Sequence, residues 1–206
     1  QSIYTGLDLR GWKNIPGHAG HWKASDWILD YDGQSEADDK TLWTEKEYGD
    51  FECIVDWRFP RKPELKKVPV LLPSGDYALN EDGSRKMVEV PDAGDSGIFL
   101  RGSRKAQVNI WCWPIGSGEV WGYREDLAIP ADIRAAVTPR VNADKKPGEW
   151  NRFLITVRGE RVTVRVNGKI VIENARLPGL PPRGPIGLQH HGDPIQFANL
   201  YVRELK

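Results

Sequence analysis

The sequence predicts an all-β protein built from two packed antiparallel sheets. Three observations support this: apolar and polar residues alternate with a period of two in many short segments, turn residues are frequent, and no helical period is sustained. The 206 residues include 21 Gly and 15 Pro, which suit many turns between short strands. This length is compatible with one β-rich domain, so we expect a single domain over residues 1–206.

The expected strands follow one another along the chain, often as pairs. "DFECIVDWRF" places five apolar side chains on one parity, and "NRFLITVRGERVTVRVNGKIVIE" contains two strands joined by "RGER". The Asn-Gly turn in "VNGK" favours a tight hairpin. The strand segments are residues 50–59, 96–102, 107–113, 151–173, 184–192 and 196–205.

Three other segments depart from this pattern. Residues 130–137 and 44–49 are each expected to form a turn or two of helix. Residues 60–95 form a long insertion rich in proline and charge, in which "VPVLL" and "KMVEV" suit a surface hairpin. A connection of this length is more often functional or mobile than idle.

Composition excludes several classes of partner. Lys plus Arg and Asp plus Glu both total 29, so no net field attracts nucleic acid or an anionic membrane. The sequence contains no run of about 18 apolar residues, so no membrane span is predicted. The first residues do not read as a signal peptide, although one removed earlier stays an alternative. Cys53 and Cys112 lack metal-ligand spacing, so we expect two buried free thiols, with one disulfide as the alternative.

The segment "QVNIWCW" has an unusual open face. Its apolar parity carries Val108, Ile110 and Cys112, whereas the other parity carries two amides and two indoles, namely Gln107, Asn109, Trp111 and Trp113. Amides suit a ligand that carries hydroxyl groups, and tryptophans suit aromatic contacts in cores or ligand clefts. This face is therefore a candidate ligand cleft. The alternative for the two tryptophans is packing beneath the insertion.

Strand parity indicates which side chains share this face. Arg101 follows the inward Leu100, and Gln189 and His191 alternate with inward residues, so all three are expected on the open face. His190 is adjacent to His191, so it is expected to point to the opposite side of the strand. For His190, a structural hydrogen-bonding role and a role in the site are equal alternatives. A loop over residues 119–126 follows and is expected to border the cleft; it carries Glu119, Tyr123, Arg124 and Asp126. Surface ion pairs on a solvated loop are the alternative for its charged residues.

Five stretches, taken in order, resemble a known family. "GLDLRGWK", "LWTEKEYGDFE", "DSGIFLRG", "PGEWNRFLITVRGERVTVRVNG" and "GPIGLQHHGDPIQFANLYVREL" are similar to the 3-keto-disaccharide hydrolase domain family. This resemblance implies a jelly-roll sandwich of the concanavalin A-like lectin/glucanase type, with carbohydrate on a concave sheet. It also implies a periplasmic or secreted protein that cleaves glycosides whose sugar carries a ketone at carbon 3.

Glucanases of the same fold carry a Glu-x-Asp pattern on the equivalent strand. Gln107 and Asn109 occupy those two positions in this chain. Double-displacement hydrolysis needs two carboxyl groups about 5 Å apart, and amides replace neither of them. We therefore do not expect ordinary retaining hydrolysis from this strand.

A ketone at carbon 3 allows another route. It acidifies the hydrogen on carbon 2, so a base can remove it, the enolate can expel the group on carbon 1, and water can add. This route needs a base, donors for the enolate oxygen and an acid. The expected catalytic residues are His191, Arg101, Glu119, Arg124 and Asp126. The expected substrate-binding residues are Gln107, Asn109, Trp111, Trp113, Tyr123 and Gln189.

Alternatives stay open for the metal and for the function. The sequence establishes no cofactor, but a divalent metal could be held by His191 with Glu119 or Asp126, and calcium at a sheet edge is a separate option. A non-catalytic carbohydrate-binding module is the second function, favoured by the amides at 107 and 109. An interaction domain within a larger cell-surface assembly is a third.

Overall fold

The computed structural model describes residues 1–206, and nearly all of its regular structure is β-strand. The strands are β1 (Trp22–Ser25), β2 (Ile28–Tyr31), β3 (Leu42–Tyr48), β4 (Phe51–Arg58), β5 (Glu64–Pro69), β6 (Met87–Asp92), β7 (Ser96–Leu100), β8 (Ser103–Ile110), β9 (Asn151–Arg158), β10 (Arg161–Val166), β11 (Lys169–Arg176), β12 (Gly184–Leu188) and β13 (Ile195–Glu204). Two short helices, α1 (Trp121–Glu125) and α2 (Ala131–Ala136), lie between β8 and β9.

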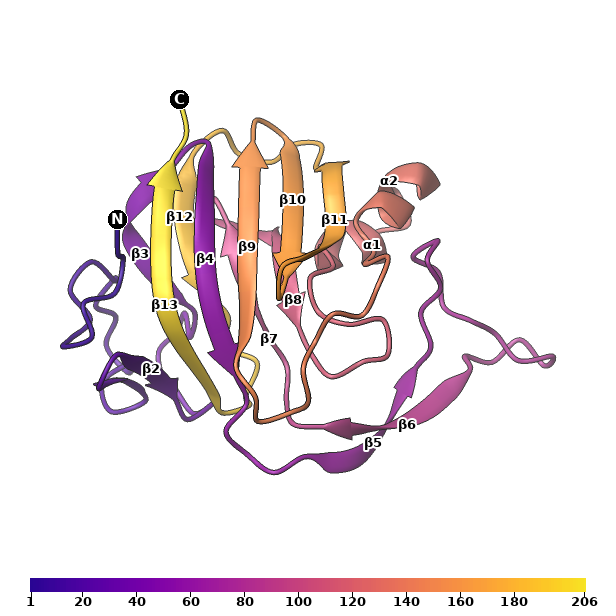
Figure 1. Cartoon of the computed structure of the whole chain (residues 1–206), viewed down its shortest axis with the longest axis horizontal. Helices are drawn as coiled ribbons and strands as arrows, with labels where there is room; N and C mark the ends of the chain where they lie inside the picture. Colours follow the sequence, from indigo (N-terminus) through magenta and orange to yellow (C-terminus); the bar gives the residue numbers. More distant parts are fainter.

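The strands form two main antiparallel sheets that face each other. The larger sheet has the order β1-β2-β13-β4-β9-β10-β11, and the smaller one has the order β3-β12-β7-β8. Figure 1 shows β13, β4, β9 and β10 as the near layer and β12, β7 and β8 behind them. The expected all-β fold of two antiparallel sheets is therefore confirmed.

The core lies between the two sheets and follows from the period of two. Alternate residues of β9, such as Phe153 and Ile155, are completely buried, as are Val162 and Val164 of β10. They belong to one contiguous cluster of 38 buried apolar residues. Burying each such side chain stabilises the fold by about 1.5–3 kcal/mol.

The insertion at 60–95 forms a separate two-stranded sheet that extends from the body of the sandwich. β5 pairs with β6, with Val68 opposite Val88, so a hairpin forms as the two apolar segments suggested. Figure 1 shows this arm extending away from the two sheets. The connection between β5 and β6 returns to the body through a contact of the Tyr77 hydroxyl with the Glu125 carboxylate, which ties the arm to α1.

Two local predictions are wrong, and one is right. Residues 44–49 form most of β3 rather than a helical turn, because Thr44 and Tyr48 are buried within the smaller sheet. Residues 121–125 form α1 rather than an open loop. The helix expected at 130–137 is α2. Neither helix is long and apolar enough to cross a membrane.

Candidate functional site

A cleft of about 190 Å³ lies on the outer face of the smaller sheet. Strand β8 contributes two of its residues, and the connections next to β7 and β12 contribute three more. The first residue of α1 completes it. The lining residues are Asp95, Gln107, Asn109, Trp121, Gln189 and His191. The structure therefore brings together four residues that parity placed on the open face: Gln107, Asn109, Gln189 and His191.

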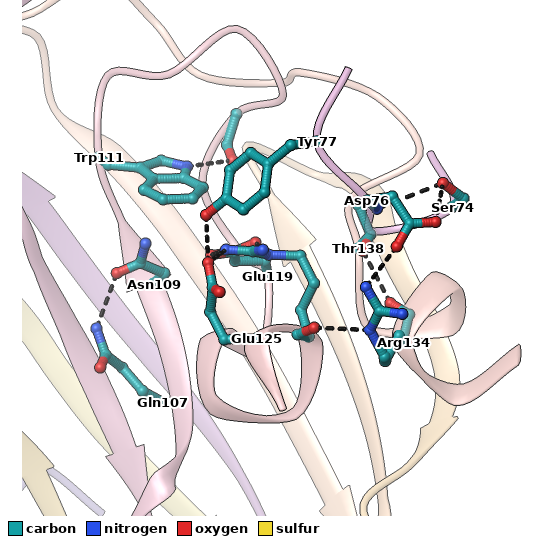
Figure 2. A network of polar contacts seen from close by, with 12 residues as sticks. Ser74, Asp76, Tyr77, Gln107, Asn109, Trp111, Glu119, Glu125, Arg134 and Thr138 are labelled. Atoms are coloured by element: carbon teal, nitrogen blue, oxygen red, sulfur yellow. Dashed lines mark hydrogen bonds and ion pairs between the residues drawn. The ribbon is translucent and has the colours of Figure 1, made fainter. Parts of the chain in front are cut away.

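The three amides of the cleft form one hydrogen-bonded unit. Gln107 Nε2 donates to Asn109 Oδ1 at 2.8 Å and to Gln189 Oε1 at 2.8 Å. Figure 2 shows the first of these bonds along the strand. Gly97 of β7 lies opposite Asn109, and a Cβ atom there would stand 2.7 Å from the Gln107 side chain. The missing side chain at 97 therefore makes room for the amide unit.

This network leaves two amide donors available to a ligand. The oxygens of Asn109 and Gln189 accept from Gln107, so the remaining nitrogens are Asn109 Nδ2 and Gln189 Nε2. Neither nitrogen is among the fully buried polar atoms that lack a hydrogen-bond partner. Fixed N–H donors of this kind can bind a sugar hydroxyl or stabilise an oxyanion that develops during a reaction.

Two carboxylates, Asp95 and Asp193, and the imidazole of His191 lie beside the amides. His191 Nδ1 lies 3.3 Å from Asp193 Oδ2, and His191 Nε2 lies 4.0 Å from Asp95 Oδ2. The carboxylate of Asp193 also accepts from the Asp95 backbone N–H at 3.0 Å and pairs with Arg61 at 3.0 Å. Asp193 therefore holds both of the other groups in place.

Asp95 and His191 both have pKa values that the surrounding cleft shifts upward. Burial raises the pKa of Asp95 to about 7, although the nearby His191 opposes the rise. The hydrogen bond with Asp193 raises the pKa of His191 above its usual value. A carboxyl group poised near neutral pH in a cleft is a candidate general base.

Arg101 does not lie in the cleft, so its predicted place on the open face is wrong. Its guanidinium is buried and donates to the carbonyls of Gly49, Gly159 and Pro181, and it pairs with Asp50 at 2.8 Å. The residue has a left-handed φ of 48° in the turn after β7. The turn breaks the strand alternation on which the prediction depended.

Glu119 and Arg124 are also not on an exposed loop. Arg124 Nε donates to Glu119 Oε2 at 2.6 Å, and neither side chain is more than 1% exposed. Burial raises the pKa of Glu119 to about 7, against the lowering effect of Arg124. Arg124 also pairs with Glu125 at 2.8 Å. Figure 2 shows Glu119 and Glu125 near Tyr77, away from Gln107.

Two further residues of this segment point elsewhere. Asp126 is paired with Lys105 at 2.6 Å on the surface, and it does not line the cleft. Tyr123 is buried, and its hydroxyl donates to the Pro178 carbonyl at 3.0 Å. The predicted positions of both at the cleft are wrong: α1 turns Tyr123 toward the core, and Asp126, which directly follows α1, pairs with Lys105 instead.

Trp111 and Trp113 stand beside the cleft rather than in it. Their rings stack at 4.0 Å with an angle of 8° between the planes, and both line a different cavity. β8 ends at Ile110, so the strand alternation does not extend to these tryptophans. They therefore do not line the cleft with Gln107 and Asn109, and they share their own cavity with Val90 and Pro91 of the insertion.

Other groups resolve alternatives that the sequence left open. The His190 ring contacts the Tyr31 hydroxyl, which is the structural role considered for it. Cys53 and Cys112 are free; Cys53 is buried and Cys112 is partly exposed. No cluster of three His, Cys, Asp or Glu side chains is arranged to hold a metal ion. Glu119 and Asp126, expected beside His191 in such a site, are paired with Arg124 and Lys105 instead.

Three residues of the site escaped the sequence reasoning. Asp95 precedes β7 and shares the parity of Gly97, so the same alternation that selected Gln189 would have found it. Trp121 is brought to the cleft by α1, which carries no helical signal of its own. Asp193 follows His191 by two residues and reaches it through the turn after β12.

Comparison with known proteins identifies a family and similar folds. The 3-keto-alpha-glucoside-1,2-lyase-like domain family matches residues 1–203. A candidate glycosyl hydrolase from Parabacteroides distasonis superposes with a TM-score of 0.61 at 16% identity, over 99% of this chain and 93% of that one. A second one from that organism gives 0.59 at 21% identity, over 100% and 98%. No curated protein sequence matches the chain.

A carbohydrate-binding module, CBM66 from Bacillus subtilis, has a TM-score of 0.53 at 14% identity, over 94% of this chain and 96% of that one. At such identities these three structures show the fold alone, and they confirm the jelly-roll sandwich. The family match covers almost the whole sequence, in agreement with the five resembling stretches. The chain therefore belongs to the family of 3-keto-alpha-glucoside-1,2-lyase-like domains.

Proposed function

We propose that this protein is a carbohydrate-active enzyme that cleaves 3-keto-glycosides by elimination, followed by addition of water. One observation carries the proposal: a carboxyl group with a near-neutral pKa, Asp95, lies 4.0 Å from His191 in a cleft with two unused amide donors. The family name, which refers to a 3-keto-glucoside lyase, supports the same substrate class.

Asp95 is the proposed base of the first step. Its ionised carboxylate takes the proton from carbon 2, and the electron pair of that C–H bond forms the enolate with the carbon 3 ketone. Asn109 Nδ2 and Gln189 Nε2 are the proposed donors to the enolate oxygen. The cleft then needs no nucleophilic carboxylate, in keeping with amides at 107 and 109.

His191 is the proposed acid of the second step. The enolate re-forms the ketone, the bond between carbon 1 and the leaving oxygen breaks, and the imidazolium protonates that oxygen. Asp193 favours the protonated ring, because it accepts a hydrogen bond from Nδ1 and leaves Nε2 to face the cleft. Water then adds across the carbon 1–carbon 2 double bond, and the proton returns to carbon 2.

The test is release of an aglycone from a 3-keto-glucoside and from the matching unoxidised glucoside. We expect release only from the oxidised substrate, since only its ketone acidifies carbon 2. Asp95→Asn is expected to lower kcat by at least about 100-fold, the lower range of general-base catalysis. Asp126→Asn is the matched control, because Asp126 pairs with Lys105 outside the cleft. Equal release from both glucosides, or full activity of Asp95→Asn, would refute this mechanism.

A non-catalytic carbohydrate-binding role is the second candidate. The observation that favours it is the replacement of strand carboxylates by the bonded amides Gln107 and Asn109. The similar fold of the Bacillus module is compatible with this role. Binding of saccharides in the cleft without turnover of any 3-keto-glycoside would select it over the enzyme.

A further inference from the structure

A second cavity, of about 330 Å³, shares no lining residue with the His191 cleft. Strand β4 contributes Trp57, and the arm contributes Val90 and Pro91 from β6. The segment after β8 contributes the two stacked tryptophans, and the loop before β9 contributes Asp144. Ligand pockets commonly span roughly 300–1,000 Å³, so this one suits a single small ring.

The stacked tryptophans form a fixed aromatic wall of this cavity. Trp111 is buried, and its Nε1 donates to the Gly116 carbonyl at 2.8 Å. Trp113 lies over it at 4.0 Å and is only partly buried, so it is the more accessible of the two rings. A rigid indole pair offers a broad apolar surface at little entropic cost.

Asp144 contributes a carboxylate oxygen without any partner in the protein. Its Oδ2 accepts from the Ser117 backbone N–H at 2.8 Å and from Ser117 Oγ at 2.9 Å. Its Oδ1 is sealed from solvent and has no hydrogen bond. Burial raises the pKa of Asp144 to about 6, and no cation lowers it. The side chain is thus fixed at one oxygen and unsatisfied at the other.

Trp57 contributes an unsatisfied donor to the same cavity. The residue is 3% exposed, and its Nε1 is buried with no hydrogen-bond partner. A buried polar group without a partner is destabilising, because no hydrogen bond compensates for its loss of water. A donor and an acceptor without partners in one aromatic cavity suggest that a ligand, rather than the protein, satisfies them.

We propose that this cavity is a second saccharide site, which holds one pyranose ring. The C–H face of the ring stacks on Trp113. A small shift of the Asp144 and Trp57 side chains toward the cavity then lets one hydroxyl donate to Asp144 Oδ1 and another accept from Trp57 Nε1, since both atoms are covered in the unbound protein. A sugar combines an apolar face with such hydroxyls. The site does not depend on a ketone at carbon 3, and therefore not on the proposed reaction.

The position of this site relates it to the cleft. Trp111 follows Asn109 by two residues, so their Cα atoms lie at most about 7 Å apart along the chain. A saccharide held at Trp113 would thus sit near the amide unit without using its donors. Both cavities can be occupied together, since no side chain belongs to both.

The test is titration of the protein with unoxidised glucose, maltose and cellobiose, followed by calorimetry and tryptophan fluorescence. We expect binding by the wild type, and at least a tenfold loss of affinity in both Trp113→Ala and Asp144→Asn. The control Trp27→Ala removes an exposed indole outside this cavity and is expected to bind normally. His191→Ala is also expected to bind normally, because it alters only the cleft. Thermal melts show that each variant is folded.

Three results would overturn the proposal. The first is that the wild type binds none of the three sugars. The second is that Asp144→Asn and Trp113→Ala bind like the wild type, and the third is that His191→Ala abolishes binding. The last result would place the sugar in the cleft. If the wild-type protein binds unoxidised sugars but does not turn over 3-keto-glucosides, the proposed reaction is refuted and the second saccharide site is still supported.

Discussion

The guanidinium of Arg124 lies 2.6 Å from the carboxylate of Glu119, in a part of the protein that water does not reach. A charge pair of this kind is costly to form but far more costly to break, since the remaining charge has no partner. The pair links α1 to the segment after β8, and Glu125 extends it toward the arm through Tyr77. It is therefore a structural element of the region beside the cleft.

Removing one partner of this pair should destabilise the fold. Arg124→Met is expected to lower the free energy of unfolding by about 3–5 kcal/mol, since Glu119 is left buried without its cation. The loss should grow as pH rises, because Glu119 must then ionise without a partner. Denaturant unfolding measures it. Lys105→Met, which opens the surface pair with Asp126, is the control and should cost much less. An unchanged Arg124→Met midpoint would contradict this account.

A second prediction separates structure from catalysis at Arg101. This residue joins three backbone carbonyls and Asp50, and it faces away from the cleft. Arg101→Gln should lower the free energy of unfolding by roughly 3 kcal/mol or more, since hydrogen bonds to a charged group are worth about 1.5–3 kcal/mol each. The folded fraction should keep the wild-type KM and kcat. A stable Arg101→Gln variant with a lowered kcat would instead support a role in the reaction.

The pH profile of kcat/KM tests the assigned proton transfers. Asp95 must be ionised to act as the base, and its pKa of about 7 predicts activity that rises as pH passes through 7. His191 must be protonated to act as the acid, and its raised pKa predicts a fall at higher pH. The expected profile is a bell near neutral pH, whose apparent pKa values belong to the coupled pair. His191→Gln should lose the alkaline limb. A profile that is flat between pH 5 and 9 would be incompatible with this assignment.

Stability at different pH values tests the burial of Asp144. Its pKa is about 6 in the folded protein and 3.8 in the unfolded chain, so the folded state binds more protons between these values. The stability of the wild type should therefore fall as pH rises from 4 to 6. Asp144→Asn removes this cost and should be more stable by about 1–3 kcal/mol at pH 8, with little difference at pH 3.5. Unfolding curves at both pH values measure it, and equal stability at pH 8 would show that the carboxylate is not desolvated.

The period of two predicted the part of the site that lies on regular strands. Gln107 and Asn109 lie on β8, and Gln189 follows β12, so their side chains occur where alternation places them. Asp95 obeys the same rule, which would have found it had the alternation been extended one step before β7. Long-range pairing then brought these segments together, as the family resemblance implied.

The errors occur where alternation stops. Arg101 has a left-handed backbone, and Trp111 comes after the last residue of β8, so neither follows the parity of its strand. Helix α1 has only five residues and shows no apolar period, which hid the inward rotation of Tyr123 and Arg124. Short helices and turns depend on tertiary contacts that no local pattern contains.

The absence of a side chain at Gly97 determines whether the Gln107 amide can keep its position in the cleft. A methyl group there would push against the Gln107 amide, which is the hub that orients both neighbouring amides. One added carbon atom would thus displace the donors of the proposed sugar site while every polar group and every charge of the cleft is retained. The arrangement of the amides therefore depends on the absence of a Cβ atom at 97 as well as on the polar groups themselves.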